Sequence, residues 1–375
     1  MTGELGNKVK RKGLIASLLI FLLFSGGGSK IFAQTPADRD DEVIRVETDL
    51  TNLFFTATNK QKAFVTTLRE EDLRIIEDGV LQKILTFQRE TDRPLSIAFL
   101  IDVSISEERT LPQEKAAARS FIEKVIHSDR DQAAIIPFTG AAFLEQGLTR
   151  DVLSIYRALE RVDVALPAYL GTGRPLSGIA SGPGMKRPPQ EGTTAIWEAI
   201  ALTSSEVLAR SADPKTPAPG RDRQSASSPR RETNQAPTQR RNAIILLTDG
   251  QDTTSRLSRA DAINRALAAE TVIYAIGIGD KKYGGVDRDE LSTVATATGG
   301  RAFFPKRDTD LSDAFAEIEQ ELRSQYLIAY SPTNKNRDGS YRQMQIEITN
   351  PALQKEQLLL RHRPGYFAKS GATNK

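Results

Sequence analysis

The sequence predicts an α/β fold: a doubly wound, mostly parallel sheet flanked by helices, with a small β-rich, sandwich-like domain formed by the two flanks. Short apolar runs such as 95–101 and 243–247 are typical of buried parallel strands. Between residues 94 and 324 these runs alternate with amphipathic helical patterns, as in a doubly wound sheet. Residues 43–90 and 325–361 are rich in β-branched and aromatic residues and indicate strands.

A basic segment and a short apolar run open the chain. Four cations between Lys8 and Lys12 precede Leu14–Phe24, an apolar run of 11 residues. This pattern is that of a secretory signal peptide, and the run is shorter than the roughly 20 residues that span a bilayer. We therefore expect a signal peptide at 1–33 and an exported protein, periplasmic, outer-surface or secreted. An uncleaved anchor is the alternative, and only then would the chain attach to a membrane.

Charge and cysteine content exclude several classes of protein. The chain carries a net charge of +3, of which residues 1–33 contribute +4, so the remainder has a net charge of −1. This argues against a nucleic-acid-binding protein. The absence of cysteine excludes disulfides, thiol nucleophiles and zinc–thiolate sites. A length of 375 residues suggests two domains, or one domain with a large insertion.

The N-terminal flank reads as a linker, residues 34–42, followed by a β-rich segment, residues 43–92. Asp78-Gly79 is a strong hairpin signal between two of its strands. The expected strands are Val43–Leu50, Leu53–Thr58, Leu73–Glu77 and Val80–Phe87.

The central domain is expected at 93–324, with flexible insertions at 165–192 and 211–241. The second insertion is rich in Pro, Ser, Gln and Arg and has too few apolar residues to order itself; a docking arm for acidic partners is the alternative. Strands are expected at 95–101, 133–138, 243–247 and 272–278, with edge strands at 142–148 and 303–304. Helices are expected from Thr110 to Ile126, Val152 to Val162, Thr194 to Leu208, Ser258 to Glu270, Arg288 to Thr298 and Leu311 to Ser324.

The C-terminal flank, residues 325–368, returns to β character, and we expect it to pair with 43–92 and to leave a disordered tail at 369–375. Its expected strands are Gln325–Tyr330, Arg342–Ile348 and Gln357–Arg361.

Oxygen-bearing side chains cluster where the predicted parallel strands end. Asp102, Ser104 and Ser106 follow the first strand, and Asp249 follows the strand 243–247. Ligands bind at the carboxyl ends of such strands, so the groups would meet if the two strands are neighbours. Thr194, which precedes a helix, would add a hydroxyl. Carboxylate and hydroxyl oxygens suit Mg²⁺ or Mn²⁺.

The order and spacing of these residues resemble the von Willebrand factor type A (VWA) domain with its metal-ion-dependent adhesion site. The likeness covers about residues 94–324 and implies a Rossmann-like VWA fold. The flanks resemble bacterial VWFA-related proteins first noted in acidobacteria. The motifs that carry this second likeness are Glu71-Asp72-Leu73, Glu77-Asp78-Gly79, Gln82, Pro94–Ser104, Thr298–Pro305 and Leu322–Asn334.

The resemblance implies that Ser104, Ser106 and Thr194 contact the ion directly, while Asp102 and Asp249 act through coordinated waters or hydrogen bonds. A partner's Asp or Glu would then complete the coordination. Ile105 stands where many relatives carry glycine. Glu107 and Glu108 follow directly, and we expect both at the rim, where they would tighten metal binding or repel an acidic partner.

The leading interpretation is an exported protein-binding module, of an adhesion or scaffold type, and not an enzyme. One alternative is a structural envelope component stabilised by its metal. The other is a metal-dependent hydrolase, which is disfavoured because the chain has only two histidines, His127 and His362, far apart in sequence. The sequence specifies neither the partner nor an oligomeric state.

Overall fold

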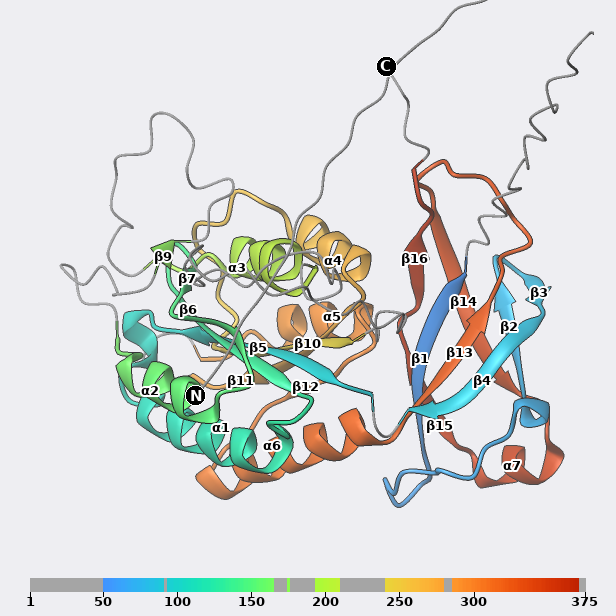
Figure 1. Cartoon of the computed structure of the whole chain (residues 1–375), viewed down its shortest axis with the longest axis horizontal. Coiled ribbons are helices and arrows are strands. Elements are labelled where there is room, and N and C mark those ends of the chain that lie inside the picture. The colour runs from blue at the N-terminus through green and yellow to red at the C-terminus, as the bar shows by residue number, and fades with distance from the viewer. Residues whose placement is uncertain are drawn as a thin grey trace, which may run out of the picture. The chain divides into compact units, whose positions relative to one another are not determined.

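A six-stranded sheet forms the centre of the α/β region in this computed structural model (Figure 1). The structure describes residues 50–90, 93–164, 174–175, 193–209, 240–279 and 285–370. The expected signal peptide, the linker, nearly all of the strand 43–50, most of both insertions and most of the C-terminal tail lie outside these residues. Among the described helices, none has the length and apolarity to cross a membrane.

The strands of the central sheet follow the order β12-β11-β10-β5-β6-β8. All neighbouring strands are parallel except β6 and β8, which are antiparallel. The predicted doubly wound, mostly parallel sheet is therefore confirmed. Its strands are β5 (Leu95–Asp102), β6 (Gln132–Phe138), β8 (Gln146–Thr149), β10 (Arg241–Thr248), β11 (Thr271–Gly277) and β12 (Ala302–Phe303), and a separate pair is formed by β7 (Phe143–Leu144) and β9 (Arg174–Pro175).

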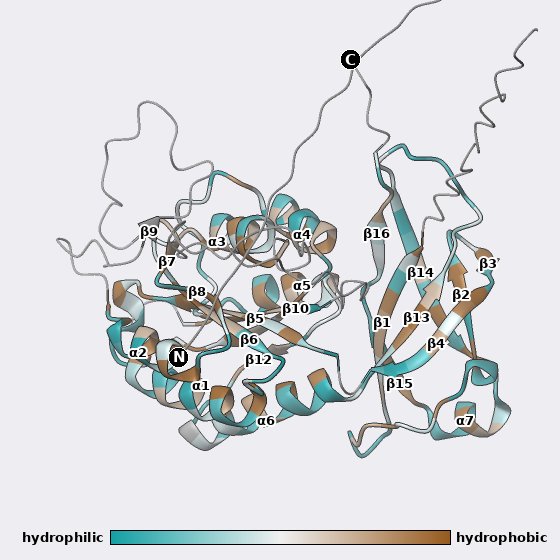
Figure 2. Ribbon diagram, viewed as in Figure 1, coloured by the Kyte–Doolittle hydropathy of each residue, from teal (hydrophilic) through white to brown (hydrophobic). Residues whose placement is uncertain are grey.

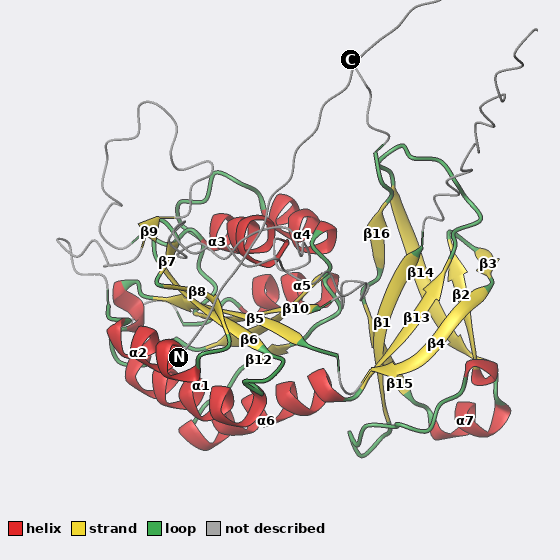
Figure 3. Cartoon of the chain, viewed as in Figure 1, coloured by secondary structure: helices red, strands yellow, loops and turns green. Residues whose placement is uncertain are grey.

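Helices cover both faces of this sheet (Figures 1 and 3). One face packs against α1, α2 and α6, and the other against α3, α4 and α5, since the buried residues of the sheet divide into two clusters with these helices. The helices are α1 (Leu111–Val125), α2 (Val152–Arg161), α3 (Ile196–Leu202), α4 (Arg259–Ala268), α5 (Arg288–Ala297) and α6 (Asp308–Arg323).

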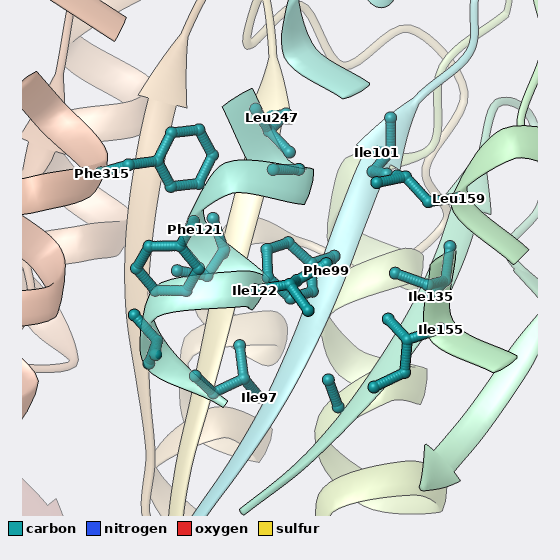
Figure 4. Close-up of a cluster of buried hydrophobic side chains, with 14 of the residues drawn as sticks. Ile97, Phe99, Ile101, Phe121, Ile122, Ile135, Ile155, Leu159, Leu247 and Phe315 are labelled. Carbon is teal, nitrogen blue, oxygen red and sulfur yellow. The ribbon is translucent and has the colours of Figure 1, made fainter. Parts of the chain in front are cut away.

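Aromatic packing closes the core on the α1 side (Figure 4). The Phe121 ring of α1 meets Phe99 of β5 edge-on at a centroid distance of 5.9 Å, and Phe315 of α6 lies 5.1 Å from Phe121. Each buried aromatic side chain contributes about 1.5–3 kcal/mol through the removal of apolar surface from water. β5 itself is buried along its whole length, as its continuous apolar sequence predicts. Figure 2 shows hydrophobic residues along the strands of the central sheet.

Several local predictions need correction. The expected single edge strand 142–148 is wrong, because the chain breaks there into β7 and β8. The expected helix 194–208 begins at Ile196 and widens into a π-helical turn at Thr203–Leu208. The expected helix that starts at Ser258 is confirmed as α4, and a capping box precedes it: the Ser258 hydroxyl accepts from Asp261 N–H, and the Asp261 carboxylate accepts from Ser258 N–H.

Two four-stranded antiparallel sheets form a separate β-sandwich, and each sheet combines two strands from each flank. Their orders are β15-β1-β13-β4 and β16-β14-β2-β3. Apolar residues from both sheets, such as Phe55, Ile75 and Ile346, fill the space between them. The elements are β1 (Thr51–Thr58), β2 (Leu73–Glu77), β3 (Val80–Gln82), β4 (Ile84–Glu90), β13 (Gln325–Tyr330), β14 (Tyr341–Ile348), α7 (Pro351–Glu356), β15 (Leu359–His362) and β16 (Gly365–Phe367).

Candidate metal site

The candidate site lies where β5 and β10 end side by side. The two strands are parallel neighbours, with Ile101 paired to Leu247. The chain leaving β5 continues to β6 on one side of this pair, whereas the chain leaving β10 continues to β11 on the other. Such a reversal of winding opens a crevice between the two departing loops. Asp102 at the end of β5 and Asp249 just after β10 therefore lie at the switch point of the sheet.

Asp102 is fixed at the floor of this crevice. Its side chain is fully buried, one oxygen accepts the Ser104 N–H at 2.9 Å, and the other accepts the Thr248 hydroxyl at 2.6 Å. Burial raises the pKa of Asp102 to about 6, although the hydrogen bonds from Thr248 and Ser104 oppose that rise. Thr248 was not singled out from the sequence, since a threonine at the end of an apolar strand carries no signal of its own.

The two serines sit on a tight turn directly after Asp102. Ser104 has extended backbone and precedes a 3₁₀ turn at Ile105–Glu107. This turn brings the Ser104 and Ser106 hydroxyl oxygens to 2.9 Å from each other. The Ser106 hydroxyl also hydrogen-bonds to the Asp249 carboxylate and opposes the rise of its pKa that burial causes. Ser106 thus links the loops that follow β5 and β10.

Asp249 is held by the loop after β10. Its carboxylate accepts the Gln251 N–H at 3.0 Å, and its carbonyl accepts the Asp287 N–H at 2.8 Å. Gly250 adopts a φ of +83°, and a Cβ there would lie only 2.9 Å from the Leu291 side chain. A glycine is therefore needed at this position for both backbone conformation and space.

Thr194 is anchored to the same loop from a different part of the chain. Its N–H donates to the Thr253 hydroxyl at 2.8 Å, and its carbonyl accepts the N–H groups of Thr253 and Thr254 at 2.9 and 3.1 Å. Among the described residues, its hydrogen bonds go to this loop, and none joins it to Asp102 or to the two serines. The structure thus brings together four of the five predicted residues by direct contact and ties Thr194 to their neighbouring loop.

Glu107 joins the site, which the sequence did not predict. We expected it at the rim, but the 3₁₀ turn directs it inward, and its side chain is fully buried. One carboxylate oxygen each of Asp102, Glu107 and Asp249 lies within 4.8 Å of the other two. Glu108 is exposed, as expected of a rim residue. The same 3₁₀ turn directs the apolar side chain of Ile105 outward, so Ile105 is exposed while the Glu107 carboxylate is buried.

Glu114 adds a further buried carboxyl from the first turn of α1. Neither of its oxygens makes a hydrogen bond of good geometry among the described residues, and its neighbours are the Thr110 hydroxyl and the Glu107 carboxyl; Oε1 of Glu107 likewise lacks such a bond. Burial raises the pKa of Glu107 and of Glu114. The negative charges of Asp102 and Asp249 nearby raise both pKa values further. Within the described part of the chain, no arginine, lysine or histidine forms an ion pair with these four carboxyl groups.

The residues of the crevice fit a hard divalent cation. They offer carboxylate and hydroxyl oxygens and no sulfur or imidazole, which is the donor set that Mg²⁺, Mn²⁺ or Ca²⁺ prefers. Buried carboxyl groups without partners are costly unless a cation or a proton offsets the charge. The Glu107 carboxylate, which lies beside Asp102 and Asp249 and has an unpartnered Oε1, is the group that an ion would satisfy.

Several further residues have structural roles. Trp197 packs in the hydrophobic core. Asp252 accepts the Ser255 N–H and so shapes a turn. His127 contacts Asp131 at 3.1 Å, and His362 Nδ1 hydrogen-bonds to the Arg363 carbonyl.

Residues 223–317 match the von Willebrand factor type A domain. The match assigns a VWA domain to this segment, which is less than half of the chain. The match contains β10, α4, β11, α5 and β12, and therefore Asp249, whereas Asp102, Ser104, Ser106, Glu107 and Thr194 precede it. No curated protein matches the chain.

Solved structures with partial similarity come from animals and bacteria. Proximal thread matrix protein 1 from the mussel byssus is 19% identical with a TM-score of 0.43, over 66% of this chain and 51% of that one. It has also been solved "with zinc occupied MIDAS motif". Bacteroides thetaiotaomicron BatB is 17% identical (TM-score 0.40; 61% and 100% covered), and a von Willebrand factor type A protein from Catenulispora acidiphila is 13% identical (0.43; 87% and 74%). The chain spans about half the length of the mussel protein.

Proposed function

We propose that this chain is an exported protein-binding module that recognises its partner through a divalent cation in the β5–β10 crevice. The observation that carries the proposal is the buried carboxylate of Glu107, which gathers with those of Asp102 and Asp249 and whose Oε1 has no hydrogen-bonding partner among the described residues. Three supporting features are the switch-point position, the donor set of hard oxygens and the VWA domain match, since VWA domains are typically interaction modules. Export rests on the basic and apolar pattern of residues 1–33.

The residues have distinct roles in this proposal. Ser104, Ser106 and Thr194 would offer hydroxyl oxygens to Mg²⁺ or Mn²⁺, while Asp102 and Asp249 would hold coordinated waters or accept hydrogen bonds from the serines. The ion would supply a positive position that a partner's Asp or Glu can fill. Thr248 orients Asp102 through its 2.6 Å hydrogen bond, a supporting role that neighbours of metal ligands commonly have.

A peptide array tests the recognition of carboxylates. Each peptide that contains Asp or Glu is paired with a copy in which Asn or Gln replaces it, and the array is probed with the protein in Mg²⁺ and then in EDTA. We expect binding to a subset of the acidic peptides only, lost in EDTA and lost in Asp102→Ala. Equal binding to acidic and amide copies, or binding that survives EDTA, would contradict the proposal.

A further inference from the structure

Glu107 has two unlike carboxylate oxygens. Oε2 accepts the hydroxyl of Thr110 at 2.5 Å, whereas Oε1 is buried without a partner. The side chain cannot reach water where it stands, because it is fully buried. The 3₁₀ turn and Thr110 together fix this orientation, since the Thr110 hydroxyl also lies 3.2 Å from the Glu107 carbonyl. Besides Thr110, the neighbours of this carboxyl are other carboxyl groups, those of Glu114, Asp102 and Asp249, and no cation among the described residues pairs with it.

The spacing of the three carboxylates fits a single ion. Their nearest oxygens lie within 4.8 Å of one another. Two ligands on opposite sides of one Mg²⁺ are separated by about 4.2 Å, and on opposite sides of one Ca²⁺ by about 4.6–5.2 Å, since these are twice the usual metal–oxygen distances. The carboxylates of Asp102, Glu107 and Asp249 are therefore close enough to share one cation, directly or through its coordinated waters.

We propose that Glu107 is an internal carboxylate ligand of the ion and competes with a partner's carboxylate for it. This inference rests on the proposed metal site. Two carboxylates would leave a dication without net negative charge around it, whereas a third makes the occupied site net negative. An acidic partner then meets a less electrophilic ion and must displace Glu107 to bind. Glu107, in the turn that follows the two serines, would therefore weaken the binding of an acidic partner.

Metal titration separates ligation from a general effect of charge. Mn²⁺ is titrated by calorimetry into the wild-type protein, Glu107→Gln, Glu107→Asp and Glu108→Gln, with circular dichroism to check that each variant is folded. We expect Glu107→Gln to bind Mn²⁺ at least about tenfold more weakly. Glu107→Asp keeps the charge but is one methylene shorter, so it should also weaken binding. Glu108→Gln removes the neighbouring exposed charge and should bind as the wild type does.

Europium luminescence lifetimes in H₂O and D₂O count the waters on the ion and test the competition. We expect one more water on Glu107→Gln than on the wild type, and we expect acetate to displace water from that variant at a lower concentration. Failure of the wild type to bind Mn²⁺ would overturn the metal site and this inference together. Wild-type binding with no change in Glu107→Gln, or with full affinity and an unchanged water count in Glu107→Asp, would overturn the internal ligand alone. Equal acetate sensitivity of the wild type and Glu107→Gln would overturn the competition.

Discussion

The sandwich and the α/β region both bury carboxylates, but they differ in what surrounds the charge. In the sandwich, Glu77 accepts the hydroxyls of Tyr330 and Tyr366 at 2.6 and 3.1 Å and lies 3.4 Å from the buried guanidinium of Arg342. In the crevice, Glu107 and Glu114 have free oxygens and no cation partner within the described residues. A buried charge with a full set of partners serves the fold, whereas a buried charge without them indicates a ligand.

Asp131 shows that the surroundings of a buried carboxylate also differ within the α/β region. Asp131, in the α/β region, is buried and accepts from the N–H groups of Leu95 and His127 and from Arg323 at 2.8 Å. Burial alone would raise the pKa of Asp131, but these bonds outweigh it and leave the pKa below its usual value. The carboxylates of the crevice show the opposite shift. Asp131 therefore differs from the carboxylates of the crevice in its hydrogen-bonding and cationic partners, although both lie in the α/β region.

Removing the guanidinium of Arg342 from the sandwich should have the largest effect on stability. We expect Arg342→Met to lower the free energy of unfolding by about 3–5 kcal/mol, because it leaves Glu77 buried without its cation. Urea unfolding measures the change. Arg74→Met is the matched control, since Arg74 pairs with Glu347 at the surface and such pairs contribute less than about 1 kcal/mol. Equal effects of the two variants would break the comparison.

The Asp131 network should give a smaller, pH-dependent effect. Asp131→Asn is expected to cost about 2 kcal/mol at pH 7, the range for hydrogen bonds to a charged group. Because the folded-state pKa of Asp131 is lowered, its contribution is full above about pH 4 and is lost as the pH falls through the folded pKa. The wild type should therefore lose more stability on acidification than Asp131→Asn. The exposed Asp129→Asn, used as a control, should keep the wild-type profile.

Replacing a buried carboxyl group of the crevice should raise stability rather than lower it. In metal-free buffer we expect Glu114→Met to raise the free energy of unfolding by about 1–2 kcal/mol, since it replaces a buried carboxyl that has no cation partner among the described residues by an apolar chain of similar size. Glu321→Met is the matched control: this buried helical glutamate has Tyr274 at 3.4 Å and Arg301 at 3.8 Å. Chemical denaturation should show the control losing stability. Destabilisation by Glu114→Met would contradict our reading of its environment.

The smallest effect concerns the orientation of Asp102. Thr248→Val removes the hydroxyl that donates to Asp102, and we expect Mg²⁺ to bind about tenfold more weakly, as is usual for groups that position a ligand. Calorimetry gives the dissociation constant. Thr271→Val, which changes a buried threonine at the start of β11 away from the crevice, should leave it unchanged. Identical affinities in the two variants would show that Thr248 does not position Asp102 for the ion.

Long periodic segments could be predicted from sequence, and short irregular ones could not. The continuous apolar runs of β5 and β10 and the capping box of α4 depend on local residues alone, so their placement was correct. The helix α7 and the three-residue strand β16 were missed, because such short elements depend on tertiary contacts rather than on a repeating pattern. The break between β7 and β8 was missed for the same reason.

The site itself was predictable only in part. Asp102 and Asp249 follow from the rule that ligands gather at the carboxyl ends of parallel strands, provided that β5 and β10 are neighbours. Glu107 was misplaced because its direction depends on one 3₁₀ turn, and a shift of one residue in that turn would expose it. Glu107 and Glu114 lie on two separate segments, the 3₁₀ turn and α1, so no helical period in the sequence predicts that the two carboxyl groups meet.

Calorimetric titration of Mg²⁺ into the metal-free protein, beside Asp249→Ala, tests the central claim most directly. We expect saturable binding to the wild type and its loss in the variant, since Asp249 joins Asp102 and Glu107 around the proposed ion. No binding to the wild type, or equal binding to both proteins, would contradict a cation site at the ends of β5 and β10.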